Sequence, residues 1–230
     1  MENNTLKKKG FFQKIFSDNA YCWISLMCTA LIMLLVYFCY ELFPFGEVTI
    51  LRMDLYHQYG PLFAELYDRV TQFKSLIYSW NTGLGGPFLG NFFNYLASPS
   101  MIFMLLFGHE NMPEAIAAMI LAKGAFAAGS FTLYLKKSQN RHDFTTAAFG
   151  VLYAMCGWFV AYYWNVMWVD AMVYFPMVMY GIERIINRRK PCLHCFLNSH
   201  LTFKLLYGIY DLYFLGYIFS CILFLKLQHF

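Results

Sequence analysis

Charged residues are scarce in this chain of 230 residues: Asp, Glu, Lys and Arg together make up 13% of it, whereas 60% of the residues are hydrophobic. Because soluble domains carry about 25% charged residues, the composition excludes an ordinary soluble protein and predicts a polytopic membrane protein. No basic stretch alternates with aromatic residues in a polar context, which excludes nucleic acid as a partner. The seven cysteines are scattered, mostly inside apolar runs, and this indicates packing rather than a disulfide framework.

The N-terminal residues predict how the chain enters the membrane. Lys7, Lys8, Lys9 and Lys14 precede a long apolar run over residues 20–43. That run is too long for the apolar core of a signal peptide, so we expect a retained transmembrane helix. Basic residues favour the cytoplasmic side, which predicts a multi-pass protein of the cell membrane with residues 1–19 in the cytoplasm. Residues 44–114, in which acidic residues outnumber basic ones, are then extracytoplasmic.

Two helices are predicted within residues 44–114. Apolar residues recur at three- and four-residue steps from Leu62 to Trp80, and Pro61 suits a first helical turn. We therefore expect an amphipathic helix over 61–80 that lies on the membrane surface. A second apolar run, 92–107, is short for a span and is interrupted at Ser98-Pro99. If it crossed, the next basic cluster would face outward, so it is interpreted as a re-entrant or interfacial helix.

Residues 115–190 predict three further transmembrane helices, at about 115–135, 144–163 and 169–186, which leave every basic cluster on the cytoplasmic side. Gly124/Ala128 in the first of them permits close helix contact. Residues 191–230 are expected to form one or two more membrane segments, in a chain expected to be an N-terminal fragment. The predicted fold is all-α, a polytopic transmembrane helical bundle with juxtamembrane or re-entrant helices in the first extracytoplasmic loop.

Asp54 is the candidate catalytic residue. It follows the first predicted span and immediately precedes the predicted surface helix, which would hold its carboxylate at the boundary of lipid and water. An enzyme that acts on a lipid-linked substrate needs a base at that level to deprotonate an acceptor hydroxyl. Most aspartates in loops only solvate or cap the loop, and that alternative stays open.

Six further residues are candidates for substrate binding: Arg52, His57, Tyr59, Lys123, Trp168 and Asp170. Arg52 adjoins Asp54 and suits a phosphate. Lys123 lies inside a predicted span, where ionisable groups usually serve a function, here contact with a lipid phosphate or pairing with an acid; a lysine that snorkels to the interface explains it equally well. Asp170 suits the lining of the site or a divalent ion, or simply the start of a helix. The imidazole of His57 suits proton transfer or a metal ion, although a lone histidine in a loop more often serves neither. The two aromatic residues suit either sugar stacking or interfacial anchoring.

Cys192-Leu193-His194-Cys195 resembles half of a zinc site, but no second cysteine pair accompanies it. We interpret it as coincidental, and no metal site is predicted.

Four ordered motifs resemble the bacterial YfhO family over about Arg52–Arg189: Asp54…Gln58-Tyr59, Trp80-Asn81…Gly83-Leu84-Gly85-Gly86-Pro87, Tyr95-Leu96-Ala97-Ser98-Pro99 and Asn165…Met167-Trp168…Asp170…Pro176. The resemblance implies the GT-C glycosyltransferase architecture and a transferase that takes a sugar from a polyprenyl-phosphate donor. It implies a cell-envelope polymer such as teichoic or lipoteichoic acid as acceptor, with Asp54 as base. Arg52 or Lys123 would hold the donor phosphate, and Asp170 would line the acceptor side. Membrane lipid is the remaining expected partner; no cofactor is certain, and a divalent metal is an option.

Two other classes of function remain open. A non-catalytic membrane assembly protein, or an inactive truncated remnant, would need none of these side chains for chemistry. A transporter is hinted at by Lys123 and by the broken 92–107 helix.

Overall fold

The computed structural model describes residues 16–187, which are helical apart from loops and two isolated β-bridges. Most of the predicted cytoplasmic N-terminus, the membrane segments expected after residue 191 and the Cys192–Cys195 motif lie outside the described residues.

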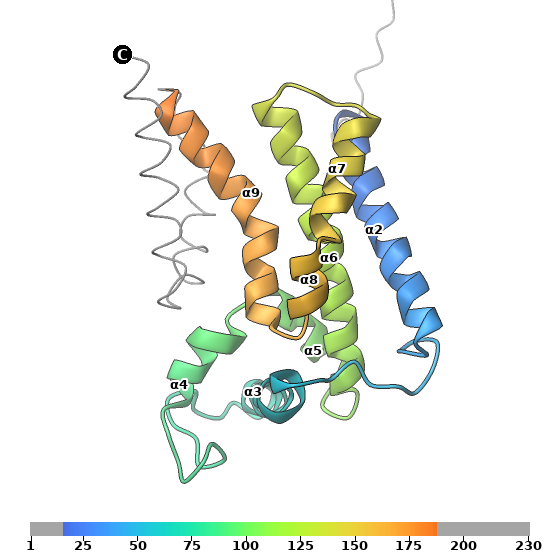
Figure 1. Cartoon of the computed structure of the whole chain (residues 1–230). Helices are drawn as coiled ribbons and strands as arrows, with labels where there is room; N and C mark the ends of the chain where they lie inside the picture. Colours follow the sequence, from blue (N-terminus) through green and yellow to red (C-terminus); the bar gives the residue numbers. More distant parts are fainter. Residues whose placement is uncertain (1–15, 188–230) are drawn as a thin grey trace, which may run out of the picture.

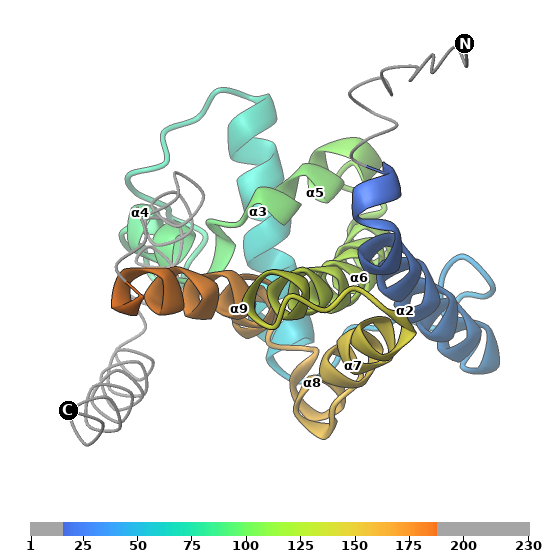
Figure 2. The same cartoon turned by 90° about the horizontal axis from the view of Figure 1, so that it is seen from above.

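A bundle of long helices forms the larger part of the molecule (Figures 1 and 2). Its members are α2 (Ala20–Cys39), α6 (Met112–Ser138), α7 (Phe144–Ala154) with the short α8 (Gly157–Tyr162) after it, and α9 (Val166–Ile186). Helix α6 occupies the centre and packs against α2, α7 and α9. The prediction of an all-α, polytopic helical fold is confirmed.

Three of the described helices are long and apolar enough to cross a membrane, namely α2, α6 and the α7–α8 pair over Phe144–Tyr162. They coincide with the first, second and third spans expected from the sequence. Helix α9 takes the place of the fourth expected span beside α6, but it carries Asp170, Glu183 and Arg184 and is not among the three. A fourth crossing by α9 therefore stays a prediction.

Small residues bring α2, α6 and α7 together. Gly150 of α7 faces Thr132 and the backbone carbonyl of Ala128 on α6, so closely that a Cβ atom at position 150 would lie 2.7 Å from that carbonyl oxygen. The hydroxyls of Thr132 and Ser25 are 2.9 Å apart and join α6 to α2. Close backbone approach and interhelical hydrogen bonds are the usual means by which membrane helices associate.

The amphipathic helix predicted over 61–80 is observed in part, as α3 (Gly60–Thr71), preceded by a π-helical turn, η1 (Leu55–Tyr59). Its location on the membrane surface stays a prediction. Helix α3 lies across the end of the bundle (Figure 1) and buries Leu62, Phe63 and Leu66. The second half of the prediction is wrong, because the chain leaves the helix after Thr71. Phe73 adopts a left-handed φ of 53°, and residues 72–87 form a loop closed by a bridge between Ser79 and Gly86.

The apolar run over 92–107, predicted as a re-entrant or interfacial helix interrupted at Ser98-Pro99, belongs to a bent pair of helical arms. Its first arm consists of α4 (Phe88–Asn91) and η2 (Phe92–Leu96), and its second of η3 (Pro99–Met101) and α5 (Ile102–Phe107). The two arms meet at 102°, the geometry of a re-entrant loop or a broken span. The break follows from Ser98-Pro99, because Ser98 is extended and its side chain caps the Ser100 amide.

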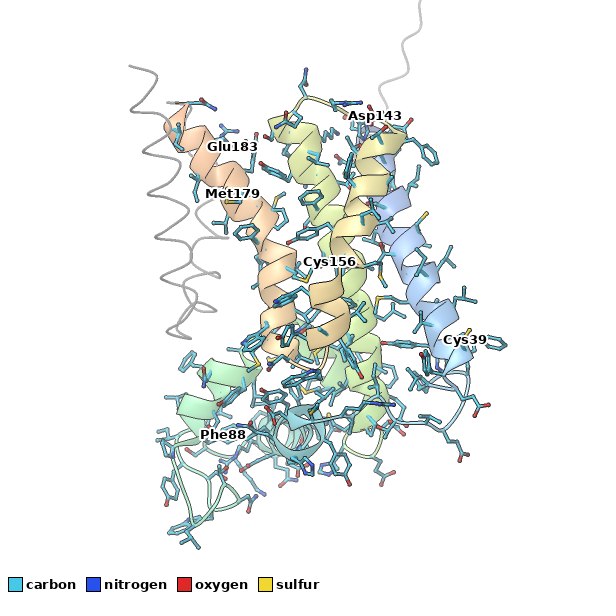
Figure 3. The ribbon with its side chains drawn as sticks, in the orientation of Figure 1. Cys39, Phe88, Asp143, Cys156, Met179 and Glu183 are labelled. Atoms are coloured by element: carbon cyan, nitrogen blue, oxygen red, sulfur yellow. The ribbon has the colours of Figure 1, made fainter. Side chains whose placement is uncertain are left out.

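The two ends of the bundle differ in charge. Lys136, Lys137 and Arg141 gather around the α6–α7 loop, where Asp143 caps the start of α7 with 3.0 Å between its Oδ1 and the Thr146 amide. Figure 3 places Asp143 at one end and Phe88 at the other. Helix α3 and the link that carries Asp54 therefore lie at the end opposite the basic cluster (Figure 1). The cytoplasmic location of the basic end stays a prediction.

Candidate functional site

Arg52 and Asp54 lie in the link between α2 and η1, and both side chains are exposed. Between them, Met53 has a left-handed φ of 51°, which is uncommon for a residue with a side chain. Asp54 then begins the π-helical turn without capping it through its side chain. Strained backbone and π-helical turns are both found more often than expected at functional sites. The turn leaves the Asp54 carboxylate open to solvent as a hydrogen-bond acceptor.

Arg52 lines an apolar cavity of about 470 Å³ between α2, residues 42–52, α6 and α8. Met33, Ile120 and Phe159 form part of its wall, and Arg52 is the one charged residue in the lining that the structure describes. Tyr163 lies on the same wall. An apolar cavity with a single guanidinium suits a lipid chain with an anionic headgroup.

Tyr59 fastens η1 to the turn before α9. Its hydroxyl donates a hydrogen bond of 2.7 Å to Oδ1 of Asn165, and its ring lies 5.5 Å from that of Tyr95. The side chain is only 3% exposed. Burial, together with the nearby Asp54 and Tyr95, raises the pKa of Tyr59 to about 12. The phenol thus stays protonated at neutral pH and acts as a donor.

Lys123 and Asp170, predicted separately, form a buried ion pair between α6 and α9. The distance from Nζ of Lys123 to Oδ1 of Asp170 is 2.9 Å, and Nζ also donates to the Val166 carbonyl at 2.8 Å. Each side chain is 4% exposed. The other oxygen of Asp170, Oδ2, is buried without a hydrogen-bond partner among the described residues. The structure therefore realises the alternative in which Lys123 pairs with an acid.

Neither of the two remaining candidates, His57 and Trp168, lines the Arg52 cavity. His57 is exposed, stands edge-on to Tyr56 and lines a second, polar cavity beside α3. Trp168 is 42% exposed and packs against Tyr162 and Trp158 of α8, with ring centroids 5.6 and 6.5 Å away. Trp168 thus packs in a cluster of aromatic side chains with Trp158 and Tyr162.

Among residues 16–187, no group of three or more His, Cys, Asp or Glu side chains is arranged to hold a metal ion. Asp170, the candidate considered for a divalent ion, has the Lys123 ammonium as its neighbour instead. That the protein uses a divalent metal stays an untested option.

Two contributors to the site were not among the candidate residues from the sequence. Asn165 accepts the hydrogen bond from the Tyr59 hydroxyl, and its signal in the sequence is its place in the fourth motif, as a lone amide between aromatic residues. Tyr163 joins Arg52 in the cavity, and nothing in the aromatic loop distinguishes it from its neighbours. Arg69 pairs with Glu65 one helical turn earlier, with 2.8 Å between Nη2 and Oε1, as their four-residue spacing on a helix allows.

Comparison of the sequence with known proteins identifies the family of the chain. The sequence model of the family described as bacterial membrane protein YfhO matches residues 25–227, a range that includes α2 to α9 almost in full and all seven candidate residues. Comparison with curated proteins and with solved structures gave no match. A match over this share of the sequence shows that the chain belongs to the YfhO family of bacterial membrane proteins.

Proposed function

We propose that the protein is a membrane glycosyltransferase that moves a sugar from a polyprenyl-phosphate carrier to a cell-envelope polymer such as lipoteichoic acid, on the extracytoplasmic side. One observation carries the proposal. Arg52, which lines an apolar cavity, and the exposed Asp54 are separated only by the left-handed Met53. A cation for a lipid phosphate and a base for an acceptor hydroxyl thus share one turn of the chain.

The reaction follows from the chemistry of these two side chains. The first isoprene units of the carrier occupy the apolar cavity, and the guanidinium of Arg52 binds the phosphate. Asp54 takes the proton of the acceptor hydroxyl while that oxygen attacks the anomeric carbon of the sugar. The bond from the anomeric carbon to the phosphate oxygen breaks, its electron pair leaves with polyprenyl phosphate, and Arg52 stabilises that charge. The new glycosidic bond has inverted configuration.

Within this proposal, Lys123 and Asp170 hold the scaffold rather than contact the substrates. Lys123 already donates to Asp170 and to the Val166 carbonyl, and both side chains are shielded from solvent. Val166 and Asn165 are adjacent, so the ion pair and the Tyr59 hydrogen bond meet at the start of α9. This arrangement connects the buried pair to η1 and hence to the position of Asp54. The donor phosphate is therefore assigned to Arg52.

The test is transfer of a labelled sugar from its polyprenyl-phosphate carrier to the acceptor polymer by membranes that contain the full chain. Asp54→Asn is expected to lower the rate by at least about 100-fold, the usual contribution of a general base, at unchanged protein level. Glu47→Gln is the matched control: it removes one exposed carboxylate from the same link and is expected to leave the rate within about twofold.

Two results would count against the proposal. Undiminished transfer by Asp54→Asn would remove the assigned base. If deletion of the protein abolished polymer glycosylation while Asp54→Asn and Arg52→Gln both supported it, the non-catalytic assembly role would be favoured.

A further inference from the structure

The second cavity, about 490 Å³ in volume, is a polar cleft that the proposed chemistry leaves unused. Its floor is one side of η1 and α3, from His57 to Asp68. Residues 81–83 of the 72–87 loop form one wall, and Asn91 and His109 complete the rim. The cleft begins at His57, about one turn along the chain from Asp54.

The loop that walls the cleft is held rigidly to α3. Nε and Nη2 of Arg69 donate to the same Glu65 oxygen at 2.9 and 2.8 Å, and Nη1 donates to the Ser75 carbonyl. The hydroxyl of Ser79 donates to that Glu65 oxygen too. The Arg69 guanidinium lies 4.6 Å from the ring centre of Phe88. A wall pinned by a mostly buried ion pair is preorganised, which lowers the entropy lost when a ligand binds.

The lining of the cleft has the chemistry of a site for neutral hydroxyl groups. The amides of Gln58, Asn81 and Asn91 each offer a donor and an acceptor. Oγ1 of Thr82 is shut off from solvent without a partner among the described residues, and a bound hydroxyl would satisfy it. No Lys or Arg belongs to the described lining, whereas Glu65 and Asp68 contribute carboxylates, and Nδ1 of His109 lies 2.9 Å from Oδ1 of Asp68. A phosphate or other anion would therefore meet two carboxylates and no lysine or arginine there.

Trp80 is not one of the residues that line the cleft, but it directly precedes Asn81 on the same loop and provides an aromatic face there. Its side chain is 77% exposed, yet its ring is fixed edge-on to Tyr78 at 5.1 Å. Gly85, with φ of 105°, lets the ring lie there, because a Cβ atom at that position would come within 3.0 Å of it. The negative face of an indole ring attracts the C–H groups of a sugar. Figure 1 shows the loop at the end farthest from the α6–α7 loop, beyond α3 and away from the spans.

We propose that this cleft binds a neutral sugar residue, with the amides and Thr82 bonded to its hydroxyls and Trp80 stacked on its ring. Two sources share this chemistry, the sugar that the carrier delivers and a sugar on the acceptor polymer. Binding of a sugar does not depend on catalysis by Asp54; only its assignment to donor or acceptor rests on the proposed function.

The binding test uses the full chain in lipid nanodiscs and methyl glucoside as the probe, detected by saturation-transfer NMR, with inorganic phosphate as a second probe. Wild-type protein is expected to bind the glucoside and not the phosphate through this cleft. Trp80→Ala and Asn81→Ala should each weaken binding at least fivefold, whereas Trp80→Phe should retain most of it. Leu84→Ala is the matched control, because Leu84 lies in the same loop and is 99% exposed, but its side chain offers neither an amide nor an aromatic face.

Asp54→Asn separates this inference from the proposed function: it should bind the glucoside normally while transfer is lost. The effect of Trp80→Ala on the two Michaelis constants identifies which sugar the cleft binds. A higher KM for the carrier-linked donor indicates the donor sugar, and a higher KM for the polymer indicates a sugar of the acceptor. The inference is overturned if wild-type protein binds no glucoside, or if Leu84→Ala weakens binding as much as Trp80→Ala. It is also overturned if both variants lose binding to lipid vesicles alike, since the loop would then be a membrane anchor.

Discussion

Breaking the Lys123–Asp170 pair should lower the free energy of unfolding by an amount that depends on which partner is removed. Lys123→Met takes away the ammonium and leaves both oxygens of Asp170 without a partner, because Oδ2 has none already. A buried charge left in this state costs about 3–5 kcal/mol. Asp170→Asn should cost less, since its amide oxygen can still accept from Lys123, which also keeps its bond to the Val166 carbonyl.

The double variant Lys123→Met/Asp170→Leu removes both charges. A buried pair exchanged for apolar side chains of similar volume is often neutral in stability, so the double variant should recover most of the loss from Lys123→Met. Thermal unfolding of the three variants and the parent protein in one detergent would measure the order: Lys123→Met lowest, Asp170→Asn intermediate, and the double variant near the parent. Equal losses in all three, or a loss below about 1 kcal/mol for Lys123→Met, would refute the reasoning.

Three other predictions concern local contacts. Tyr59→Phe leaves Asn165 without its donor and should cost about 1–3 kcal/mol in unfolding free energy. Because folding raises the pKa of Tyr59 from 10.0 to about 12, the stabilisation by its phenol is complete below pH 10 and is lost as pH rises through about 12. Unfolding curves of the variant should lack that alkaline loss of stability. Gly150→Ala should lower the melting temperature more than Gly124→Ala, because a Cβ at 150 meets the Ala128 carbonyl whereas one at 124 meets the flexible Met33 side chain. The Thr146 amide and Arg141 hold the pKa of Asp143 below its ordinary value of 3.8. The cap that Asp143 forms on the Thr146 amide is therefore complete above pH 3.8 and is lost only as pH falls through the lower pKa of the folded protein. Hydrogen exchange of the Thr146 amide should stay slow down to that lower pKa, and Asp143→Ala should make this exchange fast at every pH.

Length and hydropathy were sufficient to predict α2, α6 and the α7–α8 pair, because a span needs about 20 apolar residues and little else. The start of α3 was also predictable, since Pro61 occupies its first turn. Its end was not. Phe73, Ile77 and Trp80 continue the helical spacing, yet in the structure they are 96%, 70% and 77% exposed on a loop. Spacing alone does not reveal which apolar residues are buried.

The candidate site was predictable only in its parts. Asp54 and Arg52 stand out because they follow the first span directly, but the cavity at Arg52 is built by α2, α6 and α8, which only packing brings together. The Lys123–Asp170 contact likewise joins two helices that are distant in the sequence. The polar cleft depends on the Glu65–Arg69 pair, whose four-residue spacing is typical of an ion pair on a helix, and on the 72–87 loop, whose course the helical spacing of its apolar residues did not reveal.

The central claim places the Asp54 carboxylate at the outer surface, at the end of the bundle opposite the basic α6–α7 loop. The most direct measurement is labelling of intact cells with a membrane-impermeant thiol reagent, applied to Asp54→Cys and to Arg141→Cys and compared with the parent chain. The account predicts labelling at position 54 in intact cells and at position 141 only after the membrane is permeabilised. Labelling at 141 but not at 54 in intact cells would contradict it.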